Sequence, residues 1–148
     1  MFKKAFIFAC FIAISGFAIQ VEPFSAGEGA AIEIYETALP LLEACEFLIE
    51  DVSEAEIDCS EIETVAIENE IEMEPIEKAV TADPNMTRFA IVELKSYSRN
   101  NLLLAEDEED TEFKAALLKA GLDAFKHAVI LETLVDKWAP LEKPPKGK

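Results

Sequence analysis

The fold of this chain is most clearly predicted by residues 111–138, TEFKAALLKAGLDAFKHAVILETLVDKW. Seven apolar side chains and one histidine recur there at alternating spacings of four and three residues, along one face of a helix: Phe113, Leu117, Ala120, Ala124, His127, Leu131, Leu134 and Trp138. Further apolar residues widen this face into a stripe broad enough for packing in a helical bundle. Asp110 or Thr111 can cap the start of the helix, and Pro140 follows its end.

A helix over residues 84–105 precedes this one. Asp83 is a favourable N-cap residue, and Pro84 suits the first helical position because the missing N–H has no partner there in any helix. An acidic connector, EDEED at residues 106–110, separates the two helices. The second half of the chain therefore predicts two long helices joined by a short turn.

The first half keeps one helical seam from about residue 34 to residue 80, and periodicity alone allows a single long helix. Ser53 followed by Glu56 forms a capping box, which is a start signal in the middle of this run and favours two helices at 30–50 and 53–80. A second box, Ser60 followed by Glu63, would start the later helix further along.

Two prolines fall inside these predicted helices. Pro40 and Pro75 each predict a kink or an end, because the ring and the missing donor interrupt the backbone hydrogen bonds. The expected fold class is all-α, an antiparallel up-and-down four-helix bundle over residues 30–139. A linker at 19–29 precedes the bundle, and a tail rich in proline and lysine at 140–148 follows it.

The N-terminal segment predicts export. Two lysines near the start are followed by an uncharged, mostly apolar run at residues 5–21, which is the pattern of a signal peptide over residues 1–18. Cleavage is expected after Ala18 or after Ser15, and the alternative is an uncleaved anchor, the one way in which a membrane contact is expected. The predicted location is periplasmic or secreted.

Removal of residues 1–18 leaves two cysteines, Cys45 and Cys59. A turn near Val52 would place them seven residues to either side, facing each other across a helical hairpin. Two cysteines in an oxidising compartment are expected to pair, so a disulfide is predicted. The alternative is that both are small buried apolar residues, as free cysteines often are.

The charge of the chain lies in its first half. The net charge is -17, and no Lys or Arg occurs between Ala5 and Glu77, whereas Glu22 to Glu77 holds 18 acidic residues. From Lys78 onward, 11 basic residues face 12 acidic ones. Such an acidic chain is not expected to bind nucleic acid or an anionic membrane, and with 51% hydrophobic residues it is too apolar for a disordered protein.

This distribution predicts a binding protein whose anionic face attracts a basic protein, a basic peptide or divalent cations. The candidate binding residues are Glu46, Glu50, Glu54, Asp58, Glu63, Glu70 and Glu74. Two alternatives stay open. The acidic face is a solvated surface that provides solubility or reflects a saline habitat, or the chain is a structural or envelope-associated protein without a discrete site.

His127 is the candidate for a cofactor, because it is the one histidine of the chain and Asp123 precedes it by one helical turn. The pair could bind a metal, or His127 could be an axial haem ligand opposite Met86 or Met73. The other reading is a core histidine, and no cofactor is expected. Without a second histidine or a Gly-x-Ser-x-Gly motif, catalytic groups cannot be assembled, so the chain is not expected to be an enzyme.

A signal segment, a small helical body and thirteen residues between Cys45 and Cys59 together resemble periplasmic immunity proteins that neutralise secreted peptidoglycan amidases. The resemblance covers about residues 39–59. After the second cysteine the family has a run containing Gly and Tyr, where this chain has Ser-Glu-Ile-Glu at 60–63. The likeness is an analogy of class, and it implies an inhibitor that binds a basic toxin or hydrolase.

Overall fold

The computed structural model describes residues 29–50 and 56–141, and these residues form helices and no strands. Five α-helices and one 3₁₀ helix follow one another along the chain: α2 (Gly29–Ala44), η1 (Glu46–Leu48), α3 (Cys59–Glu68), α4 (Glu74–Ala82), α5 (Pro84–Asp107) and α6 (Thr111–Trp138). The predicted all-α class is confirmed for this part of the chain. Within it, no helix combines the length and apolarity that crossing a membrane requires.

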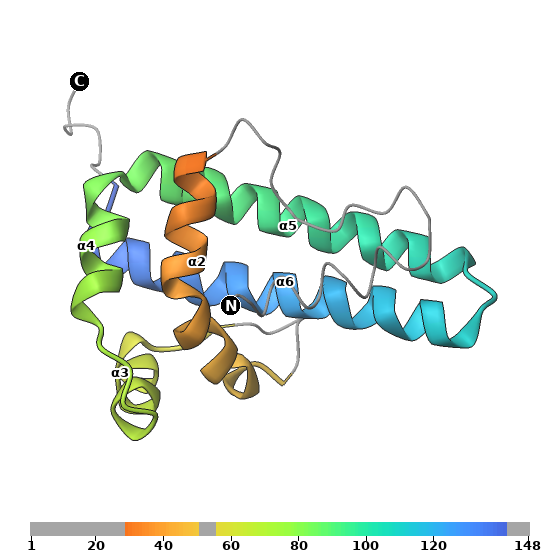
Figure 1. Ribbon diagram of the computed structural model, residues 1–148, viewed down its shortest axis with the longest axis horizontal. Helices are drawn as coiled ribbons and strands as arrows, with labels where there is room; N and C mark the ends of the chain where they lie inside the picture. Colours follow the sequence, from red (N-terminus) through yellow and green to blue (C-terminus); the bar gives the residue numbers. More distant parts are fainter. Residues whose placement is uncertain (1–28, 51–55, 142–148) are drawn as a thin grey trace, which may run out of the picture.

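The two longest helices, α5 and α6, form an antiparallel pair that runs the length of the molecule (Figure 1). The carboxylate of Asp83 accepts a hydrogen bond from the Met86 amide at 3.1 Å and caps α5. Asp110 caps α6 by accepting from the Glu112 and Phe113 amides at 3.0 and 3.1 Å. The predicted helices at 84–105 and 111–138, with their caps, are confirmed.

The first half of the chain differs from its prediction, because the helices expected at 30–50 and 53–80 are shorter and interrupted. Residues 56–58 are not helical, and α3 begins only at Cys59. Asp58 provides the N-cap, and the Glu61 side chain completes the capping box by accepting from the Asp58 amide at 3.0 Å. The prediction that residues 56–58 belong to a helix is therefore wrong. Ser53, the expected start of that helix, lies outside the described residues.

The prolines act differently from each other. Pro75 lies in the first turn of α4, and the chain between Glu68 and Glu74 is not helical, so the break predicted at this proline is confirmed. Pro40 lies inside α2, which continues to Ala44, so this proline does not end the helix.

The up-and-down arrangement of four helices is not confirmed. Figure 1 shows α2 crossing the α5–α6 pair near one end, with α3 and α4 at that same end. Length is the physical reason, since α6 is about 42 Å long and α3 about 15 Å, so the short helices cannot run along the pair. They fold over its end and bury one core there, whose largest fully buried apolar side chains include Leu41, Leu42, Ile62, Val80, Leu94, Ile130, Leu131 and Leu134.

At the edge of that core, α5 and α6 approach each other closely at Gly121. A Cβ atom on this residue would lie 2.8 Å from Leu102 Cγ and 3.1 Å from the Ser98 carbonyl oxygen. Asn101, 2% exposed, lies on the buried side of α5 between these two residues, and its Nδ2 has no hydrogen-bond partner among the described residues. The absence of a side chain at residue 121 is what allows this close packing.

Several predictions concern residues outside the described ranges. They are the signal peptide at 1–18, the linker up to residue 28, the tail from residue 142 and the candidate binding residue Glu54.

Candidate functional site

The anionic half, defined as the described residues between Gly29 and Glu77, exposes its carboxylates. Glu46 is half-buried, and every other Asp and Glu side chain there is exposed. The exposed residues are Glu33, Glu36, Glu43, Glu50, Glu56, Asp58, Glu61, Glu63, Glu68, Glu70, Glu72, Glu74 and Glu77. Among the described residues, none of these carboxylates forms a salt bridge. Five of the predicted binding residues, namely Glu50, Asp58, Glu63, Glu70 and Glu74, are therefore accessible to a partner.

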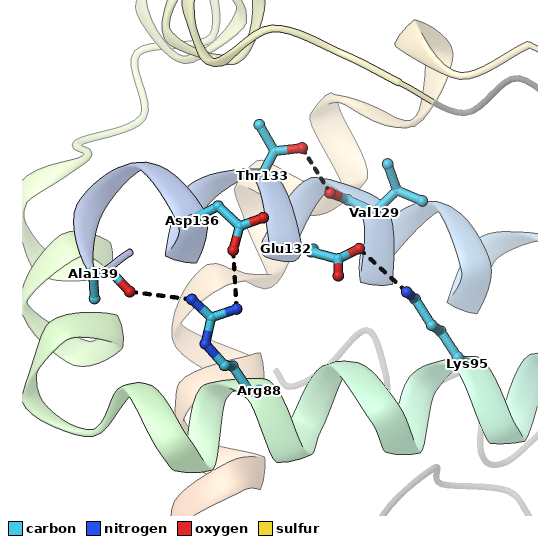
Figure 2. Close-up of polar contacts among 7 residues, drawn as sticks. All are labelled: Arg88, Lys95, Val129, Glu132, Thr133, Asp136 and Ala139. Atoms are coloured by element: carbon cyan, nitrogen blue, oxygen red, sulfur yellow. Dashed lines mark hydrogen bonds and ion pairs between the residues drawn. The ribbon is translucent and has the colours of Figure 1, made fainter. Parts of the chain in front are cut away.

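Two basic side chains of α5, Arg88 and Lys95, form ion pairs within the second half. Arg88 pairs with Asp136 at 2.9 Å and also donates to the Ala139 carbonyl oxygen at 3.1 Å, and Lys95 pairs with Glu132 at 3.2 Å. Figure 2 shows both basic side chains extending from α5 toward α6. These ion pairs join the two long helices, and they leave the carboxylates of the anionic half without compensation from Arg88 or Lys95.

An open hollow of about 550 Å³ lies between α2 and α4. Small and apolar residues line its walls, and Glu33, Glu36 and Asp83 supply three carboxylates. A lysine or arginine side chain fits this chemistry, because its methylene stem packs on apolar surface while its charge reaches carboxylate oxygens. The chemistry of this hollow, which lies between α2 and α4, therefore matches a cationic side chain.

The predicted binding residue Glu46 is not on the open surface. Its Oε2 lies 2.7 Å from Nε2 of His127, and Nδ1 of the same imidazole lies 2.7 Å from the hydroxyl of Tyr35. His127 is 5% exposed, so the three side chains form a mostly buried chain of hydrogen bonds between α2, η1 and α6. Glu46 therefore holds η1 against α6.

The donors and acceptors in this chain follow from its chemistry. A carboxylate can only accept, so Nε2 of His127 donates to Glu46. Burial, followed by the charges of Glu43, Tyr97, Glu46 and Asp123, raises the pKa of Tyr35 far above its ordinary value, so its hydroxyl stays protonated. With a neutral imidazole, that hydroxyl donates to Nδ1, and each group has a partner.

Two opposing effects act on the pKa of Glu46. Partial burial by itself raises the pKa of this carboxyl, because it penalises the charged form. The hydrogen bond and the charge of His127, with the charges of Lys119 and Lys126, outweigh burial and hold the pKa below the ordinary value of a glutamate. The ionised form of Glu46 is therefore the one that the fold stabilises.

The structure does not bring His127 and Asp123 together as metal ligands. Both ring nitrogens of His127 are hydrogen-bonded to protein groups, and Asp123 pairs with Lys119 at 2.7 Å. Among the described residues, no group of three or more His, Cys, Asp or Glu side chains could hold a metal ion. A histidine in an apolar seam needs a partner for each nitrogen, so the sequence indicates that polar partners are needed but does not identify them as Tyr35 and Glu46.

Cys45 and Cys59 are free thiols in the structure, so the predicted disulfide is not confirmed. Cys45 is fully buried between α2 and η1, and burial raises the pKa of its thiol to about 11. Cys59 is half-buried at the start of α3, and burial, followed by the charge of Glu63, raises its pKa as well. Both sulfurs are therefore protonated and weakly nucleophilic at neutral pH.

Comparison of this chain with protein-family models, curated proteins and solved structures finds no match. The arguments about function therefore depend on the charge distribution and the geometry described above.

Proposed function

We propose that this protein is a non-enzymatic binding protein whose anionic half engages a cationic partner, either a basic protein or peptide or a polyvalent cation. The observation that carries the proposal is the set of exposed carboxylates on α2, α3, α4 and the segments between them, none of which has a salt-bridge partner among the described residues. An exported inhibitor, similar in class to an immunity protein, is the specific form that we favour.

Electrostatic repulsion supports this proposal. Carboxylates closer together than the Debye length of about 8 to 10 Å repel each other even at physiological salt. A bound cationic surface removes this repulsion and adds attraction, and the anionic field also steers a basic partner toward the protein. The hollow between α2 and α4 gives one place where a lysine or arginine of that partner would sit.

The test is a set of thermal melts of the purified protein at low salt, titrated with NaCl, CaCl₂ or hen lysozyme as a basic probe protein. Lysozyme is expected to raise the Tm saturably, beyond the effect of NaCl at the same ionic strength, because it binds the folded state. Succinylated lysozyme, in which the lysines carry carboxylates, is the matched control and is expected to have no such effect. If all additives act only through ionic strength, the acidic surface serves solubility and the proposal fails.

The disulfide between Cys45 and Cys59 is a further part of the proposal, and it applies to the protein in an oxidising compartment. Cys45 belongs to the apolar core, and Cys59 packs against that same core. Closing the loop between them is expected to add about 3 kcal/mol to the free energy of unfolding. Alkylation of the denatured exported protein, followed by mass measurement, should modify neither residue until a reductant is added. Modification of both without reductant would contradict the disulfide.

A further inference from the structure

Helix α3 has one face in the core and one face open to solvent. Ile62, Val65 and Ala66 are at most 3% exposed, whereas Ile67 on the opposite side is 78% exposed. It is the most exposed of the large apolar side chains in the described residues. Figure 1 shows α3 at one edge of the molecule.

Exposed glutamates precede and follow Ile67 at a spacing of about one helical turn. Glu63 precedes it by one helical turn and is therefore its neighbour on the helix surface. Glu70 lies one turn beyond, where its amide donates to the Ile67 carbonyl oxygen at 3.2 Å. Ile67 thus lies between two exposed glutamates in this part of the chain, and neither carboxylate has a basic partner among the described residues.

The position of Glu70 is fixed by the end of the helix. Glu70 has φ of 56°, and the Ile71 amide donates to the Ala66 carbonyl oxygen at 2.8 Å. This is a Schellman motif, in which the residue with positive φ is most often glycine because a Cβ is unfavourable there. The chain thus carries a carboxylate beside Ile67 at a position where glycine would be more stable.

We propose that the outer face of α3 docks a segment of a basic protein that presents an apolar side chain between lysines or arginines. This inference rests on the proposed function and narrows the partner from any polyvalent cation to a cationic, amphipathic protein segment. Charge complementarity argues for this occupant, because Glu63 and Glu70 match basic residues on both sides of the contact with Ile67. A purely ionic partner would leave the Ile67 side chain in water. A partner with an apolar side chain would cover it, and the removal of this apolar surface from water favours binding.

The test compares two probes by calorimetry: a lysine–leucine peptide designed as an amphipathic helix, and an oligolysine of equal charge. Binding of the lysine–leucine peptide is expected to weaken about tenfold in Ile67→Ala, as for loss of a buried apolar contact. Oligolysine binding should stay unchanged in that variant. Val92→Ala, which truncates another exposed apolar side chain, on α5, is the control and should change neither affinity.

A second variant tests the same face without loss of apolar area. Glu70→Gly is expected to raise the Tm, because glycine suits the positive φ, and to weaken binding of the lysine–leucine peptide. If Ile67→Ala and Glu70→Gly leave that binding unchanged while both probes still bind, the docking face is wrong and the proposed function stands. If neither probe binds beyond ionic-strength effects, both fail.

Discussion

Replacement of His127 with leucine is expected to lower the free energy of unfolding by about 3 kcal/mol, the range for breaking a buried hydrogen-bond network. Leucine has a comparable apolar volume, but it removes both ring nitrogens and leaves the Glu46 carboxylate without its partner in a partly buried position. Denaturation with urea, followed by circular dichroism, measures the change. Thr133→Val, which loses one hydrogen bond to the Val129 carbonyl oxygen within α6, is the control and should cost far less (Figure 2).

The pH dependence of the same network gives a second readout. The pKa of Glu46 is lower in the folded state than its ordinary value, so the ionised carboxylate contributes stability above the ordinary glutamate pKa of about 4.3. That contribution is lost as the pH falls through the lowered folded pKa. The difference in stability between the wild type and Glu46→Gln should therefore shrink below about pH 4. A difference that is independent of pH down to strong acid would show that Glu46 acts without its charge.

Replacement of Gly121 with valine is expected to destabilise the protein by about 2 kcal/mol, because the packed α5–α6 contact has no room for a side chain. The Cβ would meet the Leu102 side chain at 2.8 Å and the Ser98 carbonyl oxygen at 3.1 Å, and the second of these groups is backbone that cannot rotate away. The measurement is again urea denaturation.

Two variants make this result specific. Gly29→Ala is the control, since a Cβ there has no neighbouring atom within 4 Å, and its effect should be small. Adding Leu102→Ala to Gly121→Val should recover part of the lost stability, because the closest contact is then removed. A Gly121→Val variant as stable as the wild type would mean that α5 and α6 can separate at this point without cost.

The second half of the fold could be predicted from the sequence because its signals are local. Asp83 with Pro84, and Asp110 before the apolar stripe, are start signals that lie within a few residues of the helices they begin. In the first half, the predicted N-caps are Ser53 and Ser60, whereas the structure uses Asp58 with Glu61. Periodicity also tells which face of a helix is buried but not which helix covers it, so the crossing of α2 was not predictable.

The candidate site divides in the same way. Glu50, Asp58, Glu63, Glu70 and Glu74 are exposed, and their role in binding stays a prediction. Glu46 is adjacent in sequence to residues that face solvent, but its position is determined by His127, 81 residues away. The partner of a buried polar group depends on tertiary packing, and a single sequence does not record it.

The close contact at Gly121 has a consequence for how stability is distributed along the molecule. Ala105 and Leu117, beyond this contact toward the connector, are buried but do not belong to the main core cluster. Among the described residues, fewer helices therefore pack against α5 and α6 near the connector at 108–110 than at the end where α2 and α4 lie. Segments of this kind open by themselves at a lower free energy than the whole domain, which amide hydrogen exchange detects. The far end of the pair can therefore fray and reclose while the anionic half stays folded.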